Sequence, residues 1–131
     1  MRSFLQNKLW CDKAVGLLEM MGSKIHWIRL GDEAFDRELR VKLVEETQQV
    51  VQAKTRQEMC SELADIQGVI ASLCALHGIS LQEVTNAQMQ KRSERGGFEG
   101  RRYVTVAEYP AGSFGEKYCL NDPDKYPEIV N

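Results

Sequence analysis

The three prolines of this chain all lie at or after position 110, so its first hundred residues lack the strongest helix breaker. Apolar residues in that part recur every three or four positions, which is the period of an α-helix. The length of 131 residues favours one domain, and 43% hydrophobic with 27% charged residues is typical of a soluble globular protein. A chain of this size buries only about two-thirds of its unfolded surface, so oligomerisation would help its stability.

The clearest helix is predicted at about 33–54, with Asp32 as its cap. Its apolar residues follow one another at spacings of four and seven and so form one stripe: Phe35, Leu39, Leu43 and Val50.

Two capping-box patterns predict the next helices. The first, Thr55 to Glu58, opens a helix whose apolar residues are spaced 4-3-4-3 and which ends at Gly78: Met59, Leu63, Ile66, Ile70 and Leu73. The second, Ser80 to Glu83, opens a helix at about 81–95, which Gly96 and Gly97 stop. Short links between three helices predict an all-α, antiparallel helical bundle, completed by oligomerisation.

The two ends of the chain are harder to interpret. Residues 12–21 have near-helical apolar spacing before Gly22, and residues 24–30 are a candidate for a short extended piece. We expect a helical domain over 1–103 and an extended C-terminal tail over 104–131, packed on that domain or on a neighbouring protomer. Val104, Val106 and Tyr109 are candidates for a short edge strand.

Charge and cysteine usage exclude several classes of partner. The net charge of −2 gives no electrostatic case for nucleic acid or an anionic membrane. We see no long apolar run and no signal peptide, so the cytoplasm is the expected location. No pair of cysteines has Cys-x-x-Cys spacing, and we expect Cys60 and Cys74 to be small core residues.

Four oxygen-bearing side chains are the candidates for metal binding. Glu46 and Gln49 are three residues apart on one predicted helix, and Glu62 and Asp65 are three apart on the next. Residues with this spacing share a helix face, so antiparallel helices can aim all four at one point. Oxygen ligands suit Mg²⁺, with Mn²⁺ as an alternative. The competing interpretation is a solvated acidic helix face.

Cations and aromatics supply further candidates for substrate binding. Lys91 and Arg95 share a face at the end of their helix, where they either clamp a phosphate or respond to the helix dipole. Trp10 and Trp27 are candidates for stacking on a base, although core or interface positions are the commoner use of tryptophan. We interpret His26 and His77 as structural.

Three segments together resemble the MazG-like all-α nucleotide pyrophosphohydrolases, and more closely their phosphoribosyl-ATP pyrophosphohydrolase-like, house-cleaning branch. The acidic pattern has a spacer of twelve residues between its two halves. The opening of that branch, Lys-Leu-Val-Arg-Asp-Lys, is similar to residues 8–13. The matching segments are Lys42-Leu43-Val44-Glu45-Glu46, Glu62-Leu63-Ala64-Asp65 and Lys91-Arg92-Ser93-Glu94-Arg95-Gly96-Gly97-Phe98.

The resemblance implies hydrolysis of a nucleoside triphosphate to a monophosphate and pyrophosphate by a homodimer or homotetramer. It implies that Glu46, Glu62 and Asp65 ligate Mg²⁺ and that Glu45 is a ligand or supports one. Glu45 and Glu46 are the expected catalytic carboxylates. By the same resemblance, Lys91 and Arg95 bind phosphate, and Lys8, Asp12 and Lys13 border the site, with the two lysines as further phosphate contacts.

Two departures from the family pattern keep other functions open. Gln49 stands where the family has an acid, and Cys11 stands where it usually has Arg. Either change can retune, weaken or abolish activity. The alternatives are phosphoribosyl-ATP hydrolysis and a helical binding or regulatory module that has lost catalysis. The sequence does not indicate the base, the sugar, the choice between dimer and tetramer, or the role of the tail.

Overall fold

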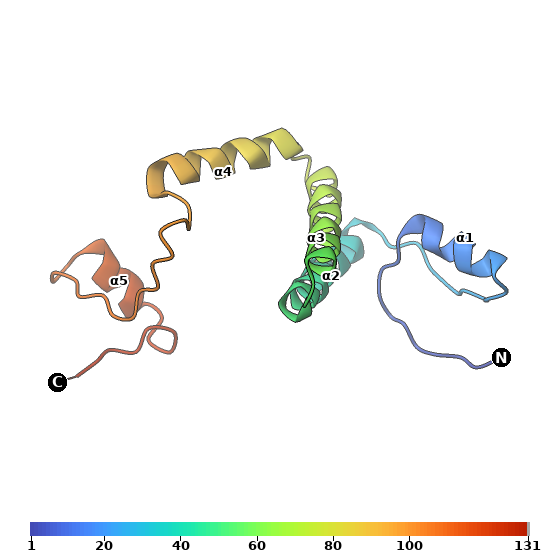
Figure 1. Cartoon of the computed structure of the whole chain (residues 1–131), viewed down its shortest axis with the longest axis horizontal. Coiled ribbons are helices and arrows are strands. Elements are labelled where there is room, and N and C mark those ends of the chain that lie inside the picture. Colours follow the sequence, from blue (N-terminus) through green and yellow to red (C-terminus); the bar gives the residue numbers. More distant parts are fainter. Residues whose placement is uncertain (131) are drawn as a thin grey trace. The chain divides into compact units, whose positions relative to one another are not determined.

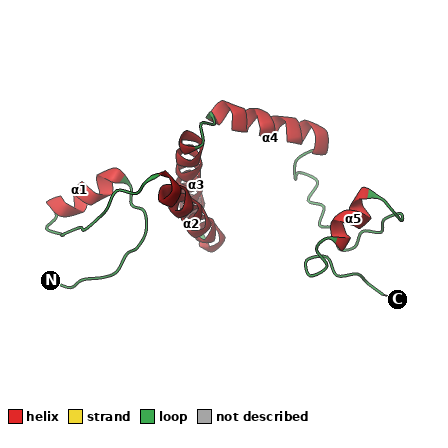
Figure 2. Ribbon diagram, turned by 180° about the vertical axis from the view of Figure 1, so that it is seen from behind, coloured by secondary structure: helices red, strands yellow, loops and turns green. Residues whose placement is uncertain are grey.

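The computed structural model describes residues 1–130 and confirms the predicted all-helical class. No strand occurs among the described residues, so the edge strand expected at 104–109 is absent and residues 24–30 have no regular structure. Figures 1 and 2 show the helices, which are α1 (Asp12–Met20), α2 (Asp32–Gln52), α3 (Arg56–Leu76), α4 (Leu81–Arg95) and α5 (Phe114–Leu120).

The centre of the fold is the pair formed by α2 and α3, which lie side by side in both ribbon views (Figures 1 and 2). Only residues 53–55 join the two helices, so α3 must turn back antiparallel along α2. Thr55 begins α3 as predicted: its hydroxyl accepts a hydrogen bond from the Glu58 amide at 3.1 Å. The Glu58 carboxylate in turn accepts a hydrogen bond from the Lys54 amide at 2.8 Å, so the beginning of α3 has a capping box.

Apolar burial is concentrated between these two helices. The buried apolar residues among those described are Leu39 on α2 and Val69 and Cys74 on α3. Cys60 and Cys74 were both predicted to be core residues. The prediction is confirmed for Cys74 and wrong for Cys60, which is exposed. The apolar seam of α3 also lies further along the helix than the 4-3-4-3 spacing suggested. Met59 and Leu63 are exposed, while Ile66, Ile70 and Leu73 are half-buried.

A side-chain cluster ties the end of α3 to the beginning of α2. His77 Nε2 donates to Asp36 Oδ1 at 2.6 Å, and Arg40 Nε donates to Asp36 Oδ2 at 3.0 Å. The hydrogen bond from His77 is the main reason why the pKa of Asp36 lies below its ordinary value, with Arg40 adding to the effect. The structural interpretation of His77 agrees with this contact.

The beginning of α2 differs from the prediction. Gly31 is the N-cap, and no side chain caps this helix. Asp32 is instead the first helical residue, where its carboxylate faces the positive end of the helix dipole. At α1 the prediction is closer: the helix ends at Met20, and Gly22 follows with a φ of +98°, a conformation that glycine adopts freely.

α4 has the predicted bounds, but it does not pack along α2 or α3. Its first turn carries a complete capping box, in which Ser80 N donates to Glu83 Oε2 at 2.6 Å and Glu83 N donates to Ser80 Oγ at 3.0 Å. No residue of α4 is buried, and its few large apolar residues, Leu81, Val84 and Met89, are exposed. The helix therefore has too little apolar surface to hold itself against the pair within one chain.

The residues from Arg95 onward form a second structural unit. Ring contacts organise it: Phe114 and Tyr118 have centroids 6.0 Å apart, and Tyr118 and Tyr126 are 5.6 Å apart. The ring of Tyr109 lies where any side chain at Gly115 would be, so this position requires glycine. The domain boundary expected after residue 103 and the packing partner of the tail both stay predictions.

Helix α3 is more apolar than the sequence analysis allowed. By length and composition alone it could cross a membrane, with a mean hydropathy of 1.4. One such helix is weak evidence, because core helices of soluble proteins pass the same test. Glu62 and Asp65 lie within it, and each charged side chain at a bilayer centre costs about 2.5–3.5 kcal/mol.

We expect Leu39→Ala to lower the free energy of unfolding by about 2–5 kcal/mol, because it opens a cavity between α2 and α3. Urea unfolding at a fixed protein concentration measures the change. Leu17→Ala is the matched control: Leu17 is 59% exposed, so its loss should change stability by no more than about 0.5 kcal/mol. Equal effects of the two changes would contradict the assignment of the core to this helix pair.

Candidate metal and nucleotide site

Three carboxylates converge where α2 faces α3. Glu46 comes from α2, and Glu62 and Asp65 come from successive turns of α3. One oxygen from each residue lies within 4.8 Å of the others, so the structure brings together the three acids that the sequence analysis selected. The three-residue spacing on α3 and the antiparallel return after a short link produce this geometry.

The convergence of like charges is costly in the absence of a cation. Glu46 is buried, Glu62 is half-buried and Asp65 is exposed. The pKa of Glu62 is raised, first by loss of hydration and then by the negative charges of Asp65 and Glu46. The three groups together therefore favour binding of a positive ion.

The size of the cluster suits a small divalent cation. Two oxygens bound to one Mg²⁺ lie at most about 4.2 Å apart, twice the Mg–O distance of about 2.1 Å. The observed limit of 4.8 Å is slightly wider, and small side-chain rotations close the difference. Carboxylate oxygen is the donor that Mg²⁺ and Mn²⁺ prefer, so the residues present fit such an ion.

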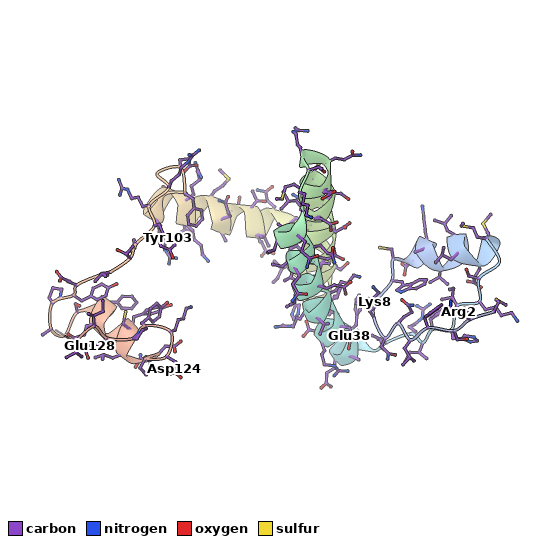
Figure 3. The ribbon with its side chains drawn as sticks, turned by 60° about the horizontal axis from the view of Figure 1, so that its bottom comes forward. Arg2, Lys8, Glu38, Tyr103, Asp124 and Glu128 are labelled. Atoms are coloured by element: carbon purple, nitrogen blue, oxygen red, sulfur yellow. The ribbon has the colours of Figure 1, made fainter. Side chains whose placement is uncertain are left out.

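Two lysines border the acids. Lys42 Nζ lies 3.5 Å from Glu45 Oε1 and also 3.5 Å from Glu46 Oε1. Lys8, on the N-terminal segment labelled in Figure 3, donates to Glu45 Oε1 at 3.5 Å. Lys42 begins the motif that contains both glutamates, and no role was predicted for it. Its spacing of three and four from the two glutamates was the available signal.

An open hollow of about 350 Å³ is lined by both lysines and by two of the acids, Glu46 and Asp65. Trp10, which was predicted to border the substrate, is one of its half-buried walls. A second hollow, of about 500 Å³, is lined by residues of α2 alone and is an uncovered helix face rather than a cleft. The first hollow is lined by Gln6, Lys8, Leu9, Trp10, Cys11, Ala14, Lys42, Glu46 and Asp65.

Other candidate residues are not among those that line this hollow. Gln49 lies one turn beyond Glu46 and is exposed. Asp12 and Lys13 are exposed on α1 and are not among the lining residues. Lys91 is exposed on α4, which does not pack along the helix pair, and Arg95 begins the second unit. The functions predicted for these residues stay predictions.

Comparison with protein families agrees with the motifs. Residues 36–97 match the model of the MazG nucleotide pyrophosphohydrolase domain, a stretch that runs from the first turns of α2 past the end of α4 and includes all three acids. The match is to the superfamily that the resemblance predicted. No curated protein and no solved structure matches the chain.

We expect Glu62→Gln to raise the melting temperature of the metal-free protein, because it removes one of three crowded negative charges. In excess Mg²⁺ the variant should melt at a lower temperature than the unchanged protein, because it lacks a ligand and is stabilised less by the cation. Differential scanning fluorimetry with EDTA or with Mg²⁺ measures both effects. A variant that still responds to Mg²⁺ like the unchanged protein would show that Glu62 is not a ligand.

Gln49→Glu is the complementary change in the same assay. It adds a fourth carboxylate one turn from Glu46, so it should lower the melting temperature in EDTA and increase the rise caused by Mg²⁺. Gln48→Glu is the control, because it makes the same substitution at an exposed neighbouring position. If both variants behave alike, position 49 does not face the cation.

Proposed function

We propose that this protein is a Mg²⁺-dependent nucleoside triphosphate pyrophosphohydrolase that removes non-standard or surplus nucleotides. The observation that supports this most is the meeting of Glu46, Glu62 and Asp65 within 4.8 Å inside a MazG domain. The lysines beside them and the tryptophan in the wall of the same hollow suit the phosphates and the base of a nucleotide.

In this proposal Glu46, Glu62 and Asp65 hold the cation. Bound Mg²⁺, or Mn²⁺, would supply charge neutralisation for the phosphates and polarise the phosphorus under attack. Glu46 also orients the attacking water toward the α-phosphorus. Glu45 supports the site rather than ligating the cation, because it is not among the three carboxylates that meet and its Oε1 contacts Lys8 and Lys42.

The departing pyrophosphate needs cations in the same hollow. Lys8 is one, and we propose Lys91 and Arg95 as others once α4 lies against the helix pair of another copy. Lys13 is a further candidate at the entrance. Their ammonium and guanidinium groups stabilise the charge that develops as the bond between the α and β phosphates breaks.

Association of copies follows from how little one chain buries. No described side chain is fully buried, and many large apolar residues of the helix pair are exposed, among them Val41, Val44, Val51 and Leu63. Covering such surface is worth about 25 cal/mol per Å², so a second copy on these faces would add substantial stability. We propose a homodimer or homotetramer located in the cytoplasm.

We expect pyrophosphate release from at least one member of a panel of canonical and modified nucleoside triphosphates, in Mg²⁺ or Mn²⁺ and not in EDTA. Coupled pyrophosphate detection measures the rate, and chromatography should identify the monophosphate as the other product. Release from no member would remove the proposal. Turnover of phosphoribosyl-ATP alone would instead identify the protein as a phosphoribosyl-ATP pyrophosphohydrolase.

Two variants serve as controls for the panel. Glu46→Gln removes a proposed ligand and should lower kcat/KM by about a hundredfold or more, within the range for loss of metal-linked charge stabilisation. Glu19→Gln makes the same chemical change at an exposed position on α1 and should leave the rate unchanged. Loss of activity in both would indicate a general charge effect instead of a site.

We expect sedimentation equilibrium to show a dimer or tetramer at micromolar concentration. Val44→Glu should shift the protein toward monomer, because Val44 is 58% exposed in one chain and the change places a charge on an exposed apolar face. A chain that stays monomeric with an unchanged melting temperature over a hundredfold range of concentration would contradict association.

A further inference from the structure

Glu45 links two segments of the chain through a single oxygen. Lys8 Nζ, from the N-terminal segment, and Lys42 Nζ, from α2, each lie 3.5 Å from Glu45 Oε1. The two ammonium groups are therefore no more than 7.0 Å apart, because they share this neighbour. Without the carboxylate their charges would repel each other at that distance. Glu45 is the carboxylate that contacts both cations and offsets this repulsion.

Both lysines line the hollow that Glu46 and Asp65 also line. One part of its wall thus carries acids that suit a divalent cation, and another carries two ammonium groups that suit phosphate oxygens. A nucleoside triphosphate bound to a divalent cation presents both kinds of partner at once. The arrangement of charge around the hollow matches that composition.

Lys42 Nζ also lies 3.5 Å from Glu46 Oε1, an oxygen of a proposed metal ligand. A divalent cation on Glu46 would cancel this attraction and repel the ammonium group. Glu45 would then be the anion that keeps Lys42 at the hollow. Glu45 is not one of the three carboxylates whose oxygens meet within 4.8 Å, so its position suits a role beside the metal rather than on it.

We propose that Glu45 is a positioning residue, which holds Lys8 and Lys42 side by side as a polyphosphate-binding subsite of the nucleotide. This inference rests on the proposed function for its ligand and assigns a role to Lys42, a residue for which sequence reasoning found none. It also gives the N-terminal segment a function, because the contact of Lys8 with Glu45 attaches that segment to α2.

Isothermal titration calorimetry with two probes tests the proposal on the full-length chain. The probes are Mg²⁺ alone and inorganic triphosphate in the presence of Mg²⁺. The variants are Glu45→Gln, Lys8→Met and Lys42→Met, and the matched control is Lys24→Met, an exposed lysine outside the hollow. Circular dichroism and melting temperature verify folding, and Lys8→Gln and Lys42→Gln replace any methionine variant that fails to fold.

Glu45→Gln should change the Kd for Mg²⁺ alone by less than about threefold and weaken triphosphate binding by about tenfold or more. Each lysine variant should weaken triphosphate by a similar factor, the loss of one charge-assisted contact. Adding Glu45→Gln to the double lysine variant should cost nothing further, because the carboxylate acts only through the lysines. Lys42→Arg should restore most of the affinity, and Lys24→Met should change neither probe.

Two results would overturn the proposal. One is a loss of binding to Mg²⁺ alone in Glu45→Gln as large as in Glu62→Gln, which would make Glu45 a ligand. The other is unchanged triphosphate affinity in either lysine variant. Binding of inorganic triphosphate requires no hydrolysis, so a failure of the nucleotide panel leaves this test intact and the two ideas fail separately.

Discussion

The contact between α2 and α3 is the interaction on which the rest of the structure depends. It buries Leu39, Val69 and Cys74, and it also forces Glu46 toward two acids of the facing helix. At this interface apolar burial thus stabilises the fold, and repulsion between the carboxylates destabilises it. A bound divalent cation removes the repulsive part, so binding and stability are coupled through this one surface.

The N-terminal segment is held to the helix pair by charge rather than by a helix packed against it. Lys8 reaches Glu45, and Trp10 closes one side of the hollow. Such exposed ion pairs contribute little to stability and weaken as salt rises. The attachment of the segment is therefore more sensitive to salt than the packing of the two helices that carry the acids.

Local signals predicted the helices well. Capping boxes and apolar spacing predicted α3 and α4 to within a residue or two. An i,i+3 argument selected four side chains, and the three acids among them meet. The same Ser-x-x-Glu signal at Ser113 to Glu116 was overlooked because nearby prolines and glycines suggested an irregular tail, and α5 begins there.

The sequence did not indicate which element packs against each apolar helix face. Periodicity marks a face as apolar but does not say what covers it, so the seam of α3 was placed too early and Cys60 was assigned to the core. The same limit applies to α4, whose position against the pair was inferred from short links alone. The pairing of Lys42 with two glutamates was visible in the spacing, although many such pairs occur on any charged helix.

The link over residues 53–55 sets the alignment of the two helices as firmly as their packing does. Three residues span at most about 11 Å, so α3 cannot slide along α2 by even one turn without breaking the Thr55 and Glu58 caps. A longer loop would cost little chain entropy, yet it would free the helices to slip by about 5.4 Å, one helical pitch. Natural variation in loop length at this point would thus act on metal affinity, at a position that touches no ligand.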